Sequence, residues 1–558
     1  MRAWIVPALT AAGALACLAL AAGPGTSRAQ EQTEATVVMG KDWRLVRDAL
    51  DTVYDELQKA NNLRTTKACD DSTFLRRVFL DLLGVPPAPA DIEAFRPGRA
   101  DSKGRRGQEK REALVAELLA RPECADNFAE YMRVQCIGRD KGGELNNLLE
   151  SYFRRAFLEN WGWDRTVREL VGAQGRTPQS PGVAYLVAFQ NVRADLTGTT
   201  SRLFMGKQIQ CAECHDHPFE HWKTDDFEGL QGFFALANSG TRGDGPDRYW
   251  FAEDRPLPNS NSELASRVRS GRNRLPKYLG GELYKLDKQR SLRQALAAWM
   301  TTPENKWFRE MTVNRFFAYF LGMGFVNPID DFNSINQASS PVILEQMGKD
   351  FAASGFDLRY LMQAICTSKQ YQRQAVPTKY NRNDRVYYSR FFVRKLAPEQ
   401  VYRSVLKVTG IEALNTGPIR NVPEAQLTEQ EKHWRAMQGR VNGYKGNLAR
   451  LFRDAYGSDE PEKAFDDYSG SILQALMLLN FSVVGEGGLR TNLTEILAAT
   501  KDPTRRVQMI YQTVLGRDPT SREWAILRNQ MATWPAGEGQ YEDLFVVLMN
   551  TTDFVTVG

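Results

Sequence analysis

Three of the four histidines of this chain, His215, His217 and His221, fall within seven positions. Two of its seven cysteines, Cys211 and Cys214, stand directly before them in the stretch CAECHDHPFEH. Thiolate and imidazole groups bind borderline metals such as zinc, and they also hold haem and its iron. A chain with so few of these residues therefore concentrates its strongest ligands in one short segment.

The spacing Cys211-x-x-Cys214-His215 is the attachment pattern of a c-type haem. Two thiols three residues apart on one turn reach the two vinyl groups of the porphyrin, and the next histidine supplies an axial nitrogen to the iron. The sequence thus predicts haem c at Cys211 and Cys214, with His215 on the iron. Met205, Met132 and His433 are the candidates for the opposite axial position.

Two other hypotheses use the same segment. Cys211 and Cys214 together with His215, His217 or His221 would suit zinc or another divalent metal, and thus a metal-dependent hydrolase or other enzyme. Alternatively, the cysteines form a disulfide or redox pair, and the segment is a structural staple in a non-catalytic envelope protein. A haem needs neither His217 nor His221, and the alternative role for both is to fix the loop or to orient His215.

The elements that must position this segment are mainly helices. In DSTFLRRVFLDLLGVPP, an Asp/Ser/Thr cluster precedes apolar residues at fourfold spacing, and Gly84 with the following prolines ends the pattern. Similar periods recur along the chain, whereas GVAYLVAF, residues 182–189, is the best candidate for a strand. Asp225 and Glu228 have the spacing of a capping box that would start the helix after the Cys/His segment.

Composition shifts divide the chain. A segment rich in Gly, Pro, Asn, Ser and Arg, residues 237–288, predicts a long irregular connection between two helical domains at 42–236 and 289–556. The expected fold class is therefore mainly α, with two domains.

Residues 1–29 have the pattern of a signal peptide, with Arg2, an apolar stretch and a small-x-small site that ends at Ala29. Export to the periplasm or cell envelope is expected, and an uncleaved anchor is the alternative. After this leader no apolar run reaches the length of a membrane span, and a net charge of +5 does not favour nucleic acid as a partner. Redox proteins of the cell envelope are the expected partners.

Export also bears on the other cysteines that remain after the leader. They form either buried free thiols or two disulfides: Cys69, Cys124, Cys136 and Cys366.

Several long motifs occur in a fixed order: DSTFLRRVFLDLLGVPPAPADIEAF, LFMGKQIQCAECHDHPFEHWKTDDFEGLQGFF, ENKWFREMTVNRFFAYFLGMGFVNPIDDFNSIN, FAASGFDLRYLMQAICTSKQYQ and ILQALMLLN. In these motifs the chain resembles the planctomycete secreted cytochrome-like family. Members pair a PSCyt-type N-terminal domain of unknown function with a PSD-type planctomycete-specific C-terminal domain. The resemblance implies export and assigns the family's haem motif to Cys211, Cys214 and His215.

One of these motifs draws attention to a second polar group. Asn314 and Arg315 lie in an aromatic-rich helix, and Asp330 and Asp331 follow it. Paired carboxylates serve acid/base catalysis or cation binding. The alternative is a salt bridge from Arg315 to one of the aspartates, with a helix-cap turn.

Overall fold

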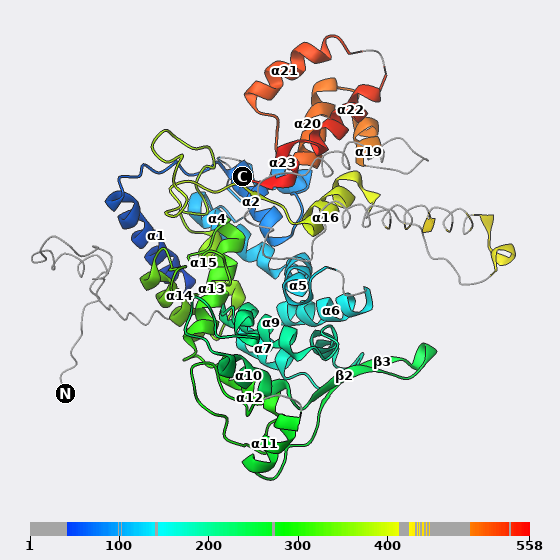
Figure 1. Cartoon of the computed structure of the whole chain (residues 1–558). Coiled ribbons are helices and arrows are strands. Elements are labelled where there is room, and N and C mark those ends of the chain that lie inside the picture. Colours follow the sequence, from blue (N-terminus) through cyan, green and yellow to red (C-terminus); the bar gives the residue numbers. More distant parts are fainter. Residues whose placement is uncertain are drawn as a thin grey trace, which may run out of the picture. The chain divides into compact units, whose positions relative to one another are not determined.

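The structure, a computed structural model, describes residues 42–558 apart from 97, 99, 102, 140–142, 271–273, 412–422, 535–536 and most of 430–491. Helices dominate this part of the chain (Figure 1), which confirms the predicted mainly α class. None of the described helices has the length and apolar character needed to cross a membrane. The predicted leader and His433 lie outside the described residues.

The first half of the described chain consists of helices joined by short turns. They are α1 (Trp43–Ala60), α2 (Asp71–Leu82), α3 (Pro89–Ala94), α4 (Gly107–Ala120), α5 (Pro122–Ile137), α6 (Gly143–Leu158), α7 (Trp163–Val171), α8 (Ala184–Val187), α9 (Arg193–Met205) and α10 (Thr224–Gln231). Helix α2 forms in the predicted segment, but the Asp/Ser/Thr cluster at 71–73 is its first turn and Asp70 is the N-cap. The side chain of Asp70 accepts a hydrogen bond of 2.7 Å from Thr73 N and satisfies a free amide of that turn.

The strand predicted at 182–189 is wrong. This segment forms the 3-10 helix η1 (Pro181–Val183) and then α8. Its residues from Val183 to Ala188 are all buried, so the segment is apolar on every side. A short, continuous apolar run of this kind has no period that distinguishes a buried strand from a buried helix.

The connection at 237–288 contains more regular structure than expected. Strands β2 (Ala237–Arg242) and β3 (Tyr249–Asp254) form an antiparallel hairpin, and β1 (Gly175–Arg176) pairs with the other edge of β3. Helix α11 (Asn261–Ser270) follows. The end of β3 is fixed by Arg293, a fully buried residue that binds the carboxylate of Asp254 through Nε and Nη2 at 2.8 and 3.0 Å.

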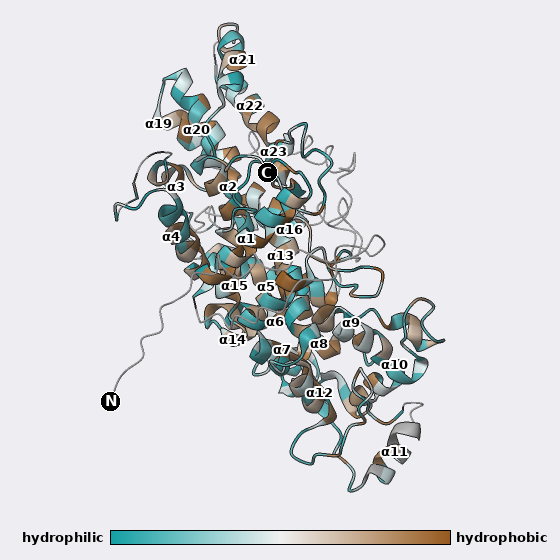
Figure 2. Ribbon diagram, turned by 90° about the vertical axis from the view of Figure 1, so that its left-hand side faces the viewer, coloured by the Kyte–Doolittle hydropathy of each residue, from teal (hydrophilic) through white to brown (hydrophobic). Residues whose placement is uncertain are grey.

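The second half is also helical. Its elements are α12 (Leu292–Met300), α13 (Lys306–Leu321), α14 (Pro341–Ala353), α15 (Leu358–Cys366), β4 (Arg394–Lys395), α16 (Pro398–Thr409), α19 (Asn492–Ala499), α20 (Pro503–Leu515), α21 (Ser521–Met531), α22 (Gly539–Met549), α23 (Thr552–Val555) and β5 (Thr556–Val557). Helix α13 is buried from residue 310 to its end and packs against α9, α14 and α15. Figure 2 colours the apolar residues of α13 and its neighbours brown.

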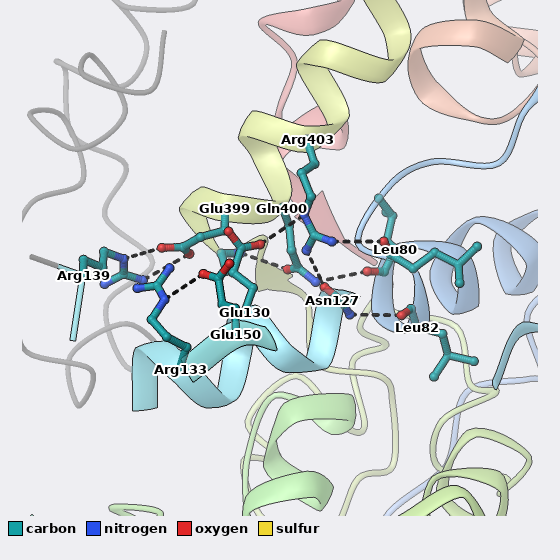
Figure 3. A network of polar contacts seen from close by, with 12 residues as sticks. Leu80, Leu82, Asn127, Glu130, Arg133, Arg139, Glu150, Glu399, Gln400 and Arg403 are labelled. Atoms are coloured by element: carbon teal, nitrogen blue, oxygen red, sulfur yellow. Dashed lines mark hydrogen bonds and ion pairs between the residues drawn. The ribbon is translucent and has the colours of Figure 1, made fainter. Parts of the chain in front are cut away.

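Helices from both halves share one polar network (Figure 3). Arg403 of α16 donates to the side chain of Asn127 on α5 at 2.6 Å, and its Nε lies 3.2 Å from the carboxylate of Glu130. Asn127 in turn donates to the last carbonyls of α2, on Asp81 and Leu82. The described residues from 42 onward accordingly belong to one compact unit. The domain boundaries at 236 and 289 stay a prediction.

Candidate functional site

The Cys/His segment lies at the surface, in the loop between α9 and α10, which we call the attachment loop (206–223). Its first part forms the 3-10 helix η2 (Gln210–Glu213). Ile209 and Ala212 are fully buried, whereas Cys211 and Cys214 are exposed and carry free thiols. A 3-10 helix has three residues per turn, so residues three apart lie on the same side. Ile209 and Ala212 therefore face the core together, and Cys211 and Cys214 face solvent together.

The hydrogen bond of His215 determines which nitrogen of its ring is available. Nδ1 lies 2.8 Å from the carbonyl oxygen of Asp216, the next residue. A carbonyl oxygen only accepts, so Nδ1 carries the proton and Nε2 of the neutral ring keeps its lone pair. The exposed side chain of His215 therefore presents a free metal-binding nitrogen beside Cys214.

His217 has the opposite arrangement. Its Nδ1 accepts hydrogen bonds from the backbone amides of Phe219 and Glu220, at 3.2 and 3.1 Å. The Nδ1 lone pair is thus occupied, and Nε2 carries the proton of the neutral ring. The backbone of His217 also donates to Trp222 O at 2.8 Å, so this residue closes the turn on both sides.

His221 packs on an aromatic side chain. Its ring centroid lies 4.1 Å from that of Trp222, and Nδ1 is 3.7 Å from a carboxylate oxygen of Glu220. Trp222 is buried and contacts Trp307 edge to face, with 6.1 Å between centroids. The side chain of His221 itself is 74% exposed.

These histidines do not assemble into a metal site with the cysteines. Within the part of the chain that the structure describes, no group of three or more His, Cys, Asp or Glu side chains could hold a metal ion. Met132 and Met205 are buried in the core, away from the exposed turn that carries Cys214 and His215. Neither thioether is therefore presented beside the predicted axial ligand.

The acids after the Cys/His segment have a different role from the predicted one. Helix α10 begins at Thr224, and the carboxylate of Asp226 accepts from Lys223 N at 2.9 Å. Asp225 and Glu228 both pair instead with Arg274. The predicted capping box is wrong because the helix starts two residues earlier, with Lys223 at the N-cap and Asp226 in the position predicted for Glu228.

A second loop supports the attachment loop. It runs from residue 327 to 336 between α13 and α14, and we call it the bracing loop. The amide of Phe332 donates to Gly206 O at 2.8 Å, and Lys207 Nζ donates to Phe332 O at 2.7 Å. The amide and hydroxyl of Ser334 both donate to Oε1 of Glu220, at 2.7 and 2.5 Å.

Both loops fall within regions that match known families. The PSCyt2 family, described as a protein of unknown function (DUF1549), matches residues 49–239. The PSD1 family, also a protein of unknown function (DUF1553), matches residues 292–531. The chain joins a PSCyt2 region to a PSD1 region. This confirms the two-domain resemblance, while no curated protein and no solved structure matches the chain.

The attachment loop thus belongs to the PSCyt2 region and the bracing loop to the PSD1 region. Sequence reasoning singled out both motifs but did not place them together. Most of the hydrogen bonds that join them have a backbone atom on at least one side, as in those from Phe332 N to Gly206 O and from Lys207 Nζ to Phe332 O, and a backbone partner leaves no pattern of residue types. The sequence contained two distinctive motifs, but no pattern in it indicated that they contact each other.

Asp330 and Asp331 of the PSD1 region bind different partners and do not act as a pair. Asp330 is buried and forms ion pairs with Arg202 of α9 and with Arg315 of α13, the latter at 3.7 Å. Asp331 instead accepts from the side-chain amide of Asn336 at 2.7 Å. The predicted salt bridge from Arg315 is therefore confirmed. The second ion pair of Asp330, to Arg202, ties the bracing loop of the PSD1 region to the PSCyt2 region.

The four remaining cysteines are buried free thiols: Cys69, Cys124, Cys136 and Cys366. Burial raises the pKa of Cys124 to about 12, and it also raises the pKa of Cys136 and Cys366. Since only a thiolate reacts or binds metal readily, these side chains behave as apolar core residues. The exposed cysteines of the described chain are those of the attachment loop.

Proposed function

We propose that this chain is an exported c-type haem protein that serves redox chemistry or electron transfer. Cys211 and Cys214 would hold the haem, and His215 would be an axial ligand. One observation carries the proposal: the bond from His215 Nδ1 to Asp216 O leaves Nε2 free on the same exposed turn as both thiols. A backbone carbonyl in this position also makes the ring a stronger ligand.

The chemistry of these side chains suits covalent attachment. Each thiol adds across the C=C bond of a vinyl group, forming one C–S and one C–H bond, so that the step needs no oxidant and releases no leaving group. The thiols of Cys211 and Cys214 are free and exposed, as this addition requires. When bound, haem supplies one-electron redox chemistry, while the chain's own residues orient the imidazole and hold the loop.

The leader at 1–29 would direct the chain to the periplasm or cell envelope, where c-type haem is attached, and redox proteins there would be its partners. The metal-dependent enzyme receives less support, because the described residues contain no preassembled metal-binding group and Nδ1 of His217 is occupied by two amides. The structural staple needs a disulfide between Cys211 and Cys214, whose thiols are free.

Expression of the full chain with its leader, in a host with haem c maturation machinery, tests the proposal. The mature protein should gain the mass of one haem and keep its Soret band after denaturation. The double variant Cys211→Ala/Cys214→Ala should lose both signals. Cys69→Ala, which removes a buried thiol outside the attachment loop, should keep them.

The other hypotheses predict different products. A colourless protein with one zinc per chain would support the metal-dependent enzyme. A colourless, metal-free protein in which mass spectrometry finds Cys211 linked to Cys214 would support the structural staple. Either result would overturn the haem proposal.

A further inference from the structure

Two large apolar side chains are left in solvent beside the Cys/His segment. Phe219 of the attachment loop is 74% exposed and Ile335 of the bracing loop is 71% exposed. Among the described residues, only Val376 exposes as large a fraction of a large apolar side chain. Single exposed apolar residues are common at protein surfaces, but two on adjoining loops form a small apolar patch.

One hydrogen-bonded joint holds these two residues close together. Phe219 directly precedes Glu220, and Ile335 directly follows Ser334. Glu220 and Ser334 are joined by two hydrogen bonds of 2.7 and 2.5 Å between the loops. The ring of Phe219 is also placed by His217, with 6.5 Å between the ring centroids. The apolar pair is therefore built by the same contacts that fix the turn after His215.

The joint is itself supported from below. Phe332 and Gly206 share a backbone hydrogen bond, and Lys207 Nζ donates to Phe332 O. The side chain of Trp307 on α13 lies under Lys207, with 5.3 Å from Nζ to the ring centroid. Both loops thus rest on α13, which is buried for most of its length.

We propose that the bracing loop of the PSD1 region forms one wall of the haem site, in which Ile335 and Phe219 cover an apolar part of the porphyrin and the Glu220–Ser334 joint sets their spacing. The inference rests on the proposed function. It gives a role to two exposed apolar side chains, one of them four residues after His215 and the other on the adjoining loop. It also gives the PSD1 region a part in the site of the PSCyt2 region.

An apolar cover has a measurable consequence. Oxidised haem carries one more positive charge than reduced haem, and a less polar environment disfavours that charge. Removing the cover should therefore lower the reduction potential while leaving the covalent attachment intact. Glu220 and Ser334 act as positioning residues, since they hold the cover without touching the haem.

The test uses matured, full-length protein and measures haem per chain, the reduction potential and the Soret maximum. We expect Phe219→Ser and Ile335→Ser to retain one haem per chain with a potential shifted to more negative values. Glu220→Ala and Glu220→Gln both remove the carboxylate charge, so the comparison between them isolates the hydrogen bonds of the joint. Glu220→Ala should have the more negative potential of the two, because the amide oxygen of Glu220→Gln still accepts from both donors of Ser334.

Val376→Ser is the matched control, since Val376 is 75% exposed and belongs to neither loop. It should leave the potential unchanged. Equal potentials for Ile335→Ser, Val376→Ser and the unmodified protein would overturn the inference and leave the proposed function standing. An unmodified protein without covalent haem would overturn the proposed function first.

Discussion

His215 and His217 carry their protons on opposite ring nitrogens, although they are two residues apart in the same loop. Nδ1 of His215 donates to the carbonyl of Asp216, whereas Nδ1 of His217 accepts from two backbone amides. One ring therefore offers a free Nε2 lone pair to solvent, and the other is used to hold the turn. This difference gives a structural role to His217, one of the two histidines that a haem does not need.

The two residues should respond differently to replacement by alanine. His217→Ala leaves the amides of Phe219 and Glu220 without their acceptor, which should cost about 1–2 kcal/mol of stability. It should not move the Soret maximum of the matured protein. His215→Ala should change stability by less than about 0.5 kcal/mol, because the side chain is exposed, but it should alter the Soret maximum.

Urea unfolding and visible spectra of the matured variants measure both effects. His221→Ala serves as the control for removing an exposed imidazole from the same loop. A Soret shift in His217→Ala as large as that in His215→Ala would contradict this assignment of roles.

Gly206 is required where α9 ends and the attachment loop begins. Its φ of +65° is left-handed, and a Cβ atom there would lie 2.6 Å from Cδ2 of Phe332. Gly206→Ala should therefore lose about 2–4 kcal/mol, from backbone strain and from displacement of the bracing loop. Gly104→Ala isolates the strain, because Gly104 has φ of +79° with no atom within 4 Å of a built Cβ, and it should lose only about 1 kcal/mol. Equal losses in thermal unfolding would show that Phe332 moves aside freely.

The ion pairs of Asp330 should matter far more than the neighbouring carboxylate. Asp330→Asn leaves Arg202 and Arg315 buried without their negative partner, which should cost about 3–5 kcal/mol. Asp331→Asn keeps an oxygen for the amide of Asn336 and should change stability by less than about 0.5 kcal/mol. Denaturant unfolding of both variants checks the difference, and similar losses would restore the view that the two acids act as a pair.

Local patterns in the sequence predicted local structure well. The Asp/Ser/Thr cluster and the fourfold spacing behind it placed helix α2 to within one residue, because a cap and a helical period are properties of neighbouring residues. Spacing alone also made Cys211, Cys214 and His215 the candidate site residues. The strand at 182–189 failed because burial on all sides removes the period on which such a prediction depends.

Long-range partners were outside the reach of the sequence. Asp225 and Glu228 have capping-box spacing but pair with Arg274, nearly fifty residues later. The attachment and bracing loops are more than a hundred residues apart, and backbone atoms form much of their contact. The two loops follow α9 and α13, and they meet because these helices pack against each other. The spacing of residues along the sequence does not encode that packing.

Glu310 on α13 gives a prediction for pH. Its side chain is 9% exposed, and burial raises its pKa to about 7 from an ordinary value of 4.5, despite Lys306 Nζ at 3.6 Å. The folded protein therefore holds this proton more tightly than the unfolded chain. The contribution to stability is fully present below pH 4.5, is lost as pH rises towards 7, and stays constant above that.

Glu310→Gln remains neutral at every pH. It should be more stable than the unmodified protein by on the order of 2 kcal/mol at pH 8, and this advantage should vanish by about pH 4.5. Urea unfolding at pH 4.5, 6 and 8 measures the difference. Glu345→Gln is the matched control on the adjacent helix, because a hydrogen bond from Lys349 lowers the pKa of Glu345. Its effect should have the opposite sign, with a loss of stability that is the same at pH 8 and pH 6 and begins to shrink only near pH 4.5. A constant difference for Glu310→Gln across this range would mean that Glu310 is ionised in the folded protein throughout.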